Sequence, residues 1–313
     1  MTTGMRYFMT VAREQSISRA AQTLFVTQQS LSEQMKRLEE QYGQLFIRRP
    51  RFQLTPAGEI LLNTLQQISV LEGNLDNQLR DIHENHVGHL RAGMHSLRAR
   101  LLLTPVIEAY SQLFPNVTLT FYDDDTVGLE EMLRRGDLDL LFGVDAREFP
   151  EFEYIFLAKE PIHLVASDNL LIRYLGYSFA ADDQHRISVS ELKRLPLIFR
   201  HNRSNFQVKI NRFFSEMSIT PSVPIIISDF EIQLMLAGQN VGACFCPHLA
   251  LRKVNEINRA RKNNFLRTFS VEGLDETSTL SLATHKYGYH PDYLHALLTL
   301  IQKEFLSDFS TNT

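Results

Sequence analysis

The chain has 313 residues, of which 44% are hydrophobic and 22% are charged, a composition typical of globular proteins and a length that suggests two or three domains. No run approaches the roughly 18 to 20 apolar residues that a membrane-spanning helix needs, and the N-terminal MTTGMRYFMTVARE lacks the apolar segment of a secretion signal. We therefore expect a cytoplasmic protein without membrane contact. The net charge of −4 is unevenly distributed, because residues 1–58 carry eight Lys and Arg against four Glu (+4) and the remainder carries −8. A basic head on an acidic body favours a polyanionic partner for the head alone.

Residues 16–38 contain two short helical patterns separated by a tight break. In the second pattern Leu31, Met35 and Leu38 recur at steps of four and three, which places them on one side of a helix. Thr27 precedes this helix as an N-cap candidate. The opposite side is entirely polar and consists of Gln28, Gln29, Ser32, Glu33 and Lys36.

The first pattern carries the small residues Ala20 and Ala21, which allow a second helix to cross closely, and we expect Phe25 and Val26 to fill the corner between the helices. This arrangement is typical of a helix-turn-helix whose second helix enters the major groove of DNA. The alternative is a surface helical hairpin with an ordinary solvated face.

Residues 45–54 read as two short β-like pieces joined by a basic tip that contains a proline. Arg48, Arg49 and Arg51 lie in this tip. Beside a helix-turn-helix such a hairpin is a wing, and its arginines can reach phosphates or the adjacent minor groove. The alternative is a solvated basic turn.

A long helix is predicted from Thr55-Pro56, a capping hydroxyl followed by a proline at the first helical position, to about residue 86. About 30 helical residues span roughly 45 Å. Its apolar stripe advances by 3.5 residues on average, the period of a coiled-coil seam, and a head of 58 residues cannot cover it. We therefore expect the helix to pair with a second copy, the alternative being that the stripe packs on the chain's own body. The stripe comprises Leu61, Leu65, Ile68, Leu71, Leu75, Leu79 and Ile82.

Residues 1–60 resemble the winged helix-turn-helix of the LysR-type transcriptional regulators. The resemblance implies a DNA-binding head, dimerisation through the linker helix and association of dimers into a tetramer. It places Gln28, Gln29 and Ser32 on the base-reading face. The matching residues are Tyr7, Phe8, Val11, Ser18, Arg19, Ala20, Ala21, Leu24, Val26, Thr27, Gln28, Leu31, Ser32, Gln34, Met35, Arg37, Leu38, Glu39, Gly43, Leu45, Phe46, Arg48, Leu54, Thr55, Pro56, Ala57 and Gly58.

Two departures from the family pattern concern which operator is preferred. Gln29 replaces the usual proline, and Glu33 stands where a basic residue is common. Phosphate would repel Glu33, whereas a cytosine amino group can donate a hydrogen bond to it. The wing between Phe46 and Thr55 is also about one residue short, which leaves open which arginine reaches the groove.

Residues 88–313 alternate strand and helix patterns, which favours parallel sheets with covering helices. Strands are expected at 88–94, 117–121 and 138–144 and helices at 96–114 and 291–306. The family resemblance implies two Rossmann-like lobes that the chain crosses twice, as in periplasmic binding proteins. The expected fold is therefore α + α/β. Its divisions are a head at 1–58, a linker helix at 59–87, lobe one at 88–161 with 268–305, lobe two at 162–267, and a tail at 306–313.

Ligands of such sheets bind at the carboxyl ends of strands, near helix N-termini. A small-molecule effector in the cleft, an anion such as a carboxylate if Arg200 points inward, is the expected second partner besides double-stranded DNA. The alternative is that Ser96 and Ser204 only cap helices. The segment 170–187 is longer than the corresponding family loop and either covers the cleft or has no role there. The expected effector-binding residues are Ser96, Leu97, Gly143, Arg200, His201, Ser204, Asp229, Phe230 and Phe245.

Other clusters carry weaker signals. Asp123, Asp124 and Asp125 lack further ligands at EF-hand spacing, and His83, His86 and His89 do not share one helix face. Cys244 and Cys246 are too far apart along a strand for an unstrained disulfide, which makes packing the better interpretation and redox sensing the alternative. We expect no metal and no cofactor.

Two functional hypotheses remain. The first is a regulator, a dimer or tetramer whose body binds a small molecule and changes the spacing or angle of two DNA-binding heads. The second is a small-molecule-binding or enzymatic α/β protein whose head is a protein-interaction module. No phosphate loop, metalloprotease helix or nucleophile elbow is present, so we expect no enzymatic activity.

Overall fold

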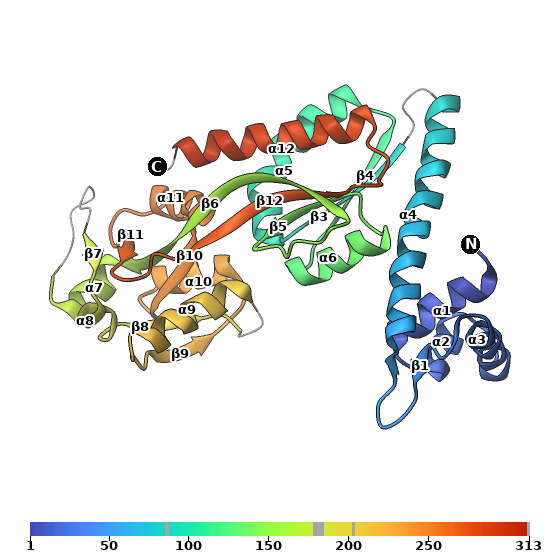
Figure 1. Cartoon of the computed structure of the whole chain (residues 1–313). Helices are drawn as coiled ribbons and strands as arrows, with labels where there is room; N and C mark the ends of the chain where they lie inside the picture. The colour runs from blue at the N-terminus through green and yellow to red at the C-terminus, as the bar shows by residue number, and fades with distance from the viewer. Residues whose placement is uncertain (85–87, 178–184, 202–203, 312–313) are drawn as a thin grey trace.

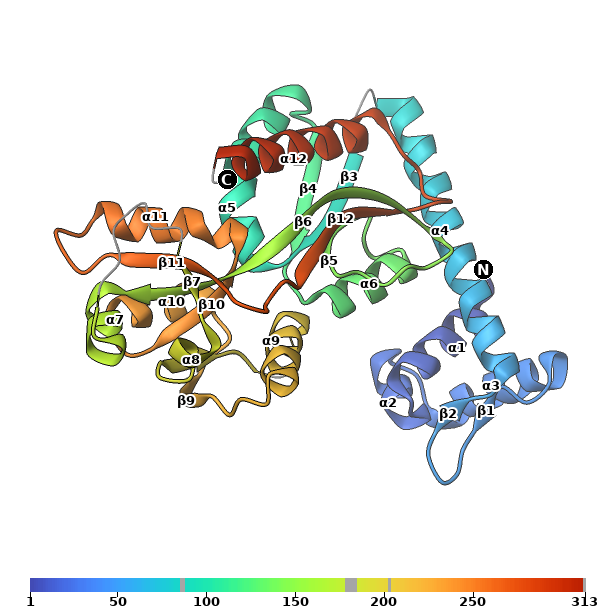
Figure 2. The same ribbon diagram turned by 60° about the vertical axis from the view of Figure 1, so that its left-hand side comes forward.

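The computed structural model describes residues 1–84, 88–177, 185–201 and 204–311. A small helical head and a two-lobed body are joined by one long helix, which stands alongside the body in Figure 1. The second view in Figure 2 shows the head's hairpin extending away from the body. The α + α/β architecture expected from the sequence is confirmed.

The head consists of three helices and a hairpin. Each helix begins at a residue whose side-chain oxygen accepts a backbone hydrogen bond, which confirms Thr27 as an N-cap; the other two caps are Thr2 and Ser16. The core contains Phe8, Leu31 and Met35, all with no exposed surface. The elements are α1 (Thr3–Glu14), α2 (Ile17–Thr23), α3 (Gln28–Tyr42), β1 (Phe46–Ile47) and β2 (Gln53–Leu54).

The turn between α2 and α3 differs from the expectation in one respect. Val26 packs against the head core, but Phe25 is 95% exposed and fills no corner. Its backbone has a positive φ of 55°, a conformation in which the side chain of an L-residue is directed away from the turn rather than into the core.

The predicted apolar seam lies on helix α4 (Pro56–Glu84), and its two halves differ in what they contact. Leu61, Leu65 and Ile68 pack against the head core, so the head covers this half of the stripe although it was expected to be too small to do so. Three leucines further along stay about half exposed, at 53%, 55% and 48%: Leu71, Leu75 and Leu79. Among the described side chains of the stripe, these three leucines are therefore the ones exposed to a partner, while the side chain of Ile82 lies outside the described residues. Glycine is needed at the start of the helix, because a Cβ on Gly58 would lie 2.3 Å from the carbonyl oxygen of Leu45.

The body is built on one continuous sheet with strand order β4-β3-β5-β12-β6-β10-β8-β9. Strand β6 is 16 residues long and pairs with β12 along its first half and with β10 and β11 along its second. We define lobe 1 as β3, α5, β4, α6, β5, the first half of β6, β12 and α12, and lobe 2 as the second half of β6 through β11. The strands are β3 (Gly88–Met94), β4 (Val117–Tyr122), β5 (Leu140–Val144), β6 (Phe152–Ser167), β7 (Arg186–Ile187), β8 (Pro196–Phe199), β9 (Ser222–Ile226), β10 (Ala243–Pro247), β11 (Leu266–Val271) and β12 (Thr277–His285).

Helices cover both lobes, and each lobe has its own apolar core. In Figure 1, α12 lies along α5 above lobe 1, while α6 faces α4. The helices are α5 (Ser96–Leu113), α6 (Thr126–Arg135), α7 (Asp168–Leu175), α8 (Val189–Leu192), α9 (Asn205–Glu216), α10 (Phe230–Gly238), η1 (His248–Ala250), α11 (Leu251–Arg259) and α12 (Asp292–Thr311).

Two details differ from the sequence interpretation. Phe269, Val271 and Leu274 belong to the core of lobe 2, so the chain returns to lobe 1 at β12 rather than at residue 268. The long segment 170–187 begins within α7 and ends in β7; residues 178–184 lie outside the described part of the chain.

Candidate nucleic-acid interface and ligand cleft

Helix α3 presents its polar side to solvent. Gln28 and Gln29 are exposed and Ser32 is half exposed, whereas the intervening Leu31 is buried. The hydroxyl of Ser18 donates to Oε1 of Gln28 at 3.0 Å, which ties the start of α2 to the start of α3. Because this bond uses only the carbonyl oxygen, the amide N–H groups of Gln28 can still donate to a base edge.

The two charged residues expected on this face each pair with the next turn of α3. Glu33 lies 2.7 Å from Arg37, and Lys36 lies 3.9 Å from Glu40. Both pairs have the i,i+4 spacing and are exposed, so they contribute little to stability. The guanidinium of Arg37 does, however, offset the negative charge that Glu33 would bring to a phosphate.

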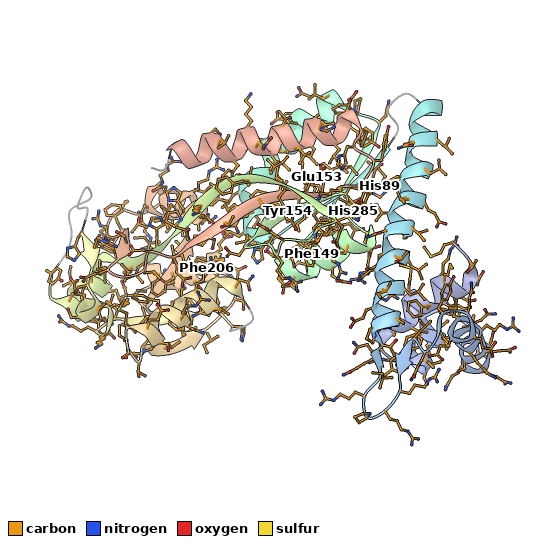
Figure 3. All side chains as sticks on the ribbon, viewed as in Figure 1. His89, Phe149, Glu153, Tyr154, Phe206 and His285 are labelled. Atoms are coloured by element: carbon orange, nitrogen blue, oxygen red, sulfur yellow. The ribbon has the colours of Figure 1, made fainter. Side chains whose placement is uncertain are left out.

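The structure separates the three wing arginines. Arg48 lies 2.7 Å from Oε2 of Glu39 on α3, and Oε1 of the same carboxylate accepts the N–H groups of Leu45 and Phe46. Arg48 therefore helps to hold the wing against α3, while Arg49 and Arg51 are exposed in the loop beyond. Figure 3 shows long side chains projecting from the tip of the hairpin.

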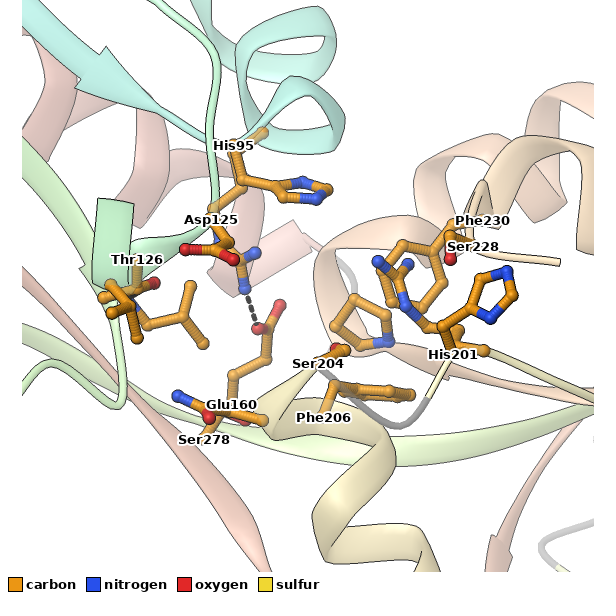
Figure 4. Close-up of a pocket in the computed structure, with 16 residues that line it drawn as sticks. His95, Asp125, Thr126, Glu160, His201, Ser204, Phe206, Ser228, Phe230 and Ser278 are labelled. Atoms are coloured by element: carbon orange, nitrogen blue, oxygen red, sulfur yellow. Dashed lines mark hydrogen bonds and ion pairs between the residues drawn. The ribbon is translucent and has the colours of Figure 1, made fainter. Parts of the chain in front are cut away.

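A cavity of about 740 Å³ lies between the two lobes. Four of the expected residues line it, namely Arg200, His201, Ser204 and Phe230. In Figure 4, Ser204 and Phe230 lie across the cavity from Asp125 and Thr126 of lobe 1. The lining residues not expected from the sequence are His95, Arg98, Asp125, Thr126, Val127, Val144, Glu160, Asn205, Phe206, Ser228, Pro247 and Ser278.

Arg200 is the charged centre of the lobe 2 wall. It is 8% exposed, and its guanidinium lies 3.9 Å from the centroid of the Phe230 ring. Its Nε and Nη1 are buried, and no acceptor for them is present among the described residues. Burial lowers the pKa of Arg200 to about 10, assisted by the charge of Arg98 and opposed by that of Asp229. The side chain is therefore still a cation at neutral pH.

A buried ion pair connects α5 with the crossing strand β6. Arg98 donates to Glu160, and both side chains are at most 5% exposed. Oε1 of Glu160 also accepts the N–H of Leu249 at 2.9 Å. The carboxylate thus holds together an element of each lobe at the floor of the cleft.

The remaining expected residues lie around the cavity rather than in its lining. The N–H of Ser96 donates to Asp123 at 2.8 Å, and Leu97 packs against the core of lobe 2. Gly143 lies within buried β5, and Phe245 is buried against the rings of Phe199 and Phe214.

Asp229 is a rim residue rather than a lining residue. It accepts the N–H of Ile232 at 3.0 Å as the N-cap of α10, and it lies 3.5 Å from Arg100 of lobe 1. Burial raises the pKa of Asp229, but the N–H of Ile232 and the charge of Arg100 outweigh burial, and the net effect lowers it.

The capping alternative for the two serines is not supported. The N-cap of α5 is His95, whose Nδ1 accepts from Leu97, so Ser96 is not the cap. Ser204 occupies the N-cap position of α9 but forms no side-chain capping bond among the described residues. Its hydroxyl therefore remains in the lining of the cavity.

Within the described ranges, no group of three His, Cys, Asp or Glu side chains is arranged to hold a metal ion. Asp125 caps α6, while His86 and the side chain of His83 lie outside the described residues. Cys244 and Cys246 are unpaired and buried, and burial raises the pKa of the Cys244 thiol to about 12. Such thiols are protonated and unreactive. No helix in the described part of the chain is long and apolar enough to cross a membrane.

Two families match almost the whole chain. Residues 2–59 match "Bacterial regulatory helix-turn-helix protein, lysR family", and residues 83–306 match "LysR substrate binding domain". The first coincides with the helical head and wing, and the second contains both lobes and the cleft between them.

Related proteins and solved structures agree with this assignment. A probable RuBisCO transcriptional regulator of Thalassiosira pseudonana is 26% identical over 90% of both chains. The uncharacterized HTH-type transcriptional regulator YwbI of Bacillus subtilis (strain 168) is 30% identical over 76% of this chain and 77% of that protein. Full-length OxyR from Pseudomonas aeruginosa shares the fold at 19% identity with a TM-score of 0.62, covering 96% of this chain and 95% of that one. Full-length CbnR, solved in complex with its target DNA, does so at 19% identity with a TM-score of 0.54, covering 96% and 98%.

These matches decide between the two functional hypotheses, because the head is a DNA-binding unit of a known regulator family and neither matched domain is catalytic. The chain belongs to the LysR family of ligand-responsive transcriptional regulators and is not an enzyme.

Proposed function

We propose that this regulator binds a carboxylate effector at Arg200 and reads double-stranded operator DNA through the exposed polar side of α3. The observation that carries the effector proposal is Arg200 itself, a buried cation in the cleft whose Nε and Nη1 have no acceptor among the described residues. Burying a guanidinium without an acceptor is unfavourable. An anionic group of the effector removes this cost.

The other charges of the cavity support an anion over a cation. Arg98 and Glu160 neutralise each other, and Asp125 is occupied as the cap of α6. Among the residues described, the positive charge of Arg200 is not neutralised by an ion pair like that of Arg98 and is therefore available to an anion. The rings of Phe206 and Phe230 meet edge to face at 5.2 Å beside it, and an apolar surface next to a buried cation suits a small organic acid.

For DNA, we propose that Gln28, Gln29 and Ser32 face base edges in the major groove, with Arg49 and Arg51 reaching phosphates or the minor groove. Thr27 and Lys36, at the start and outer side of α3, contact the backbone. Glu33 acts together with Arg37, so that the pair rather than a lone carboxylate faces the DNA. CbnR has the same overall fold and was solved on its target DNA.

We further propose a homodimer formed through the exposed leucines Leu71, Leu75 and Leu79 of α4. Two more apolar surfaces favour a tetramer. One lies at the β4 edge of the sheet and includes Leu113 and Tyr122 (60% and 37% exposed), and the other lies at the β9 edge and comprises Ile226, Ile232 and Met235 (57%, 42% and 57%). Two-fold pairing of one edge with the other would cover both. A DNA-binding regulator of this kind operates in the cytoplasm. The domain limits expected from the sequence are likewise proposed, with the return to lobe 1 placed at the start of β12.

The effector proposal is tested by calorimetric titration of the full-length chain with a panel of small carboxylic acids and their carboxamides. We expect at least one acid to bind and its amide to bind at least tenfold more weakly, since a charged hydrogen bond contributes about 1.5–3 kcal/mol. Arg200→Gln should lose this preference, whereas Arg173→Gln, at an exposed arginine of α7, should keep it. Equal binding of acid and amide, or unchanged binding by Arg200→Gln, would refute the proposal.

The DNA proposal is tested on a duplex selected by the full-length chain from a random library. Log affinity should fall linearly with log salt, by roughly 0.9 per phosphate contact. Gln28→Ala should relax the base preference, and Arg51→Ala should weaken binding to all sequences about equally and lower the salt slope by about 1. An unchanged preference in Gln28→Ala would mean that another surface reads the bases.

A further inference from the structure

The turn that joins α2 to α3 closes with two specific backbone bonds. The N–H of Val26 donates to the carbonyl of Ala21 at 3.0 Å, and that of Phe25 donates to Gln22 at 3.1 Å. This pair of bonds defines the Schellman motif, in which the residue at the position of Phe25 adopts a left-handed conformation. The φ of +55° agrees. Glycine is the usual residue here because a Cβ strains this conformation.

In the described part of the chain, burial does not compensate for an aromatic residue at this position. The flanking Leu24 and Val26 pack against the head core, but Phe25 is 95% exposed and contributes almost nothing to that core. Strained backbone conformations cluster at binding sites and other functional sites, so an exposed aromatic ring at a strained position suggests a functional role. The same end of the head carries the residues of the proposed DNA interface.

Phe25 lies two residues before Thr27, which caps α3, and three before Gln28. It is therefore continuous with the N-terminal end of the helix that is proposed to enter the major groove. We propose that Phe25 is a further DNA-contacting residue, whose ring makes an apolar contact with the groove through a thymine methyl group or deoxyribose carbons. This inference rests on the proposed placement of α3 in the major groove.

The chemistry of the neighbouring residues favours DNA as the partner. Gln28 and Gln29 provide hydrogen bonds to base edges but no apolar surface, whereas a thymine methyl group is recognised by apolar contact. The exposed ring of Phe25, beside these two glutamines, can supply the apolar contact that they lack. Because the ring is uncharged, its contribution should be independent of salt, unlike that of the wing arginines.

The test uses anisotropy titrations of full-length wild type, Phe25→Asn, Phe25→Gly and Phe25→Tyr with the duplex selected by the wild type. Asparagine tolerates the left-handed conformation and keeps a Cβ, so it removes the ring alone. We expect the asparagine and glycine variants to bind about fourfold or more weakly, as expected for loss of about one buried methyl contact, with an unchanged salt slope. The tyrosine variant should bind like the wild type.

Replacing each thymine of the duplex by deoxyuridine separates the two kinds of contact. If one replacement weakens the wild type about fourfold but leaves Phe25→Asn unaffected, the ring contacts that methyl group. If no replacement does so while Phe25→Asn still binds weakly, the ring contacts the sugars. Wild-type affinity in Phe25→Asn overturns the inference and leaves a protein partner as the occupant of this surface.

A matched control exists in lobe 2. Ser218, with φ of +52°, occupies the same position of the same motif at the end of α9, where Ile219 donates to Phe214 at 2.9 Å. Ser218→Gly and Phe25→Gly should both unfold at the wild-type temperature or above it, and Ser218→Gly should bind DNA normally. A lower unfolding temperature for Phe25→Gly would mean that the ring stabilises the head, and this would overturn the inference. If the wild type selects no duplex at all, the proposed interface itself fails.

Discussion

We expect the folding stability of the body to depend more on the charge of Glu160 than on any other charge. Glu160 is 1% exposed, it pairs with Arg98, which is 4% exposed, and it also accepts the N–H of Leu249 at 2.9 Å. In Glu160→Gln the amide oxygen can still accept from Leu249, so the substitution removes the charge but not that hydrogen bond. Arg98 is then left as a buried cation without a carboxylate. Breaking a buried pair in this way costs roughly 3–5 kcal/mol, about a fifth or more of the stability of a typical domain.

The assay is urea unfolding of the full-length chain followed by circular dichroism. Glu153→Gln is the matched control, since Glu153 is exposed on the same strand, and it should change the unfolding free energy by less than about 0.5 kcal/mol. Replacing both partners, Arg98→Met with Glu160→Gln, should recover most of the loss, because no charge is then buried alone and the amide oxygen still accepts from Leu249. The reasoning is refuted if Glu160→Gln unfolds like the wild type, or if the double variant is as unstable as Glu160→Gln.

Three further predictions concern the linker helix and the cleft. Leu75→Asp should weaken the dimer in sedimentation velocity without unfolding the chain, because the side chain is already 55% exposed. Ile60→Asp, at a position 69% exposed outside the stripe, should leave the dimer intact. Equal effects of the two substitutions would exclude the leucine stripe as the interface. Carboxylate binding should be constant from about pH 6 to about pH 9 and weaken as the pH rises through the Arg200 pKa of about 10. Calorimetry at several pH values can check this. A loss of binding that begins near pH 7 would point to a histidine instead. Asn74→Ala should accelerate amide hydrogen exchange in residues 286–290 but not in lobe 2, because Asn74 bonds the backbone of Tyr287 and Tyr289; unchanged exchange would mean that these bonds do not hold the turn.

Features that depend on a few neighbouring residues were accessible from the sequence. The spacing of Leu31, Met35 and Leu38 identified the buried side of α3, and Thr27 was recognised as its cap, because helix periodicity and capping are local properties. The prediction that Phe25 is buried between the two helices was wrong, and the reason is also local. Burial of aromatic residues is a tendency, and it cannot overrule a left-handed backbone that directs this side chain into solvent.

The position of the cleft could be predicted from the sequence, but most of the residues that line it could not. Arg200, Ser204 and Phe230 were identified because each follows a strand and lies at or near the start of a helix. Arg98 and Glu160 were missed because they are 62 residues apart and each is tolerated in the interior only through the other. The same limit explains Phe245, whose facing direction depends on which helix layer covers β10.

The contacts of the linker helix bear on how an effector can influence the heads. Val70 is 6% exposed and lies against Gly136, and Asn74 bonds the turn that follows β12; both contacts are with lobe 1. Strand β12 is itself paired with β6 over nine residues, and we expect lobe 1 and the linker helix to move as one unit. An effector that draws lobe 2 towards lobe 1 therefore changes the angle between this unit and the surfaces of lobe 2. If a second chain is seated on the β9 edge, that change of angle is transmitted to the partner, so regulation by the cleft requires the assembly and not the isolated chain.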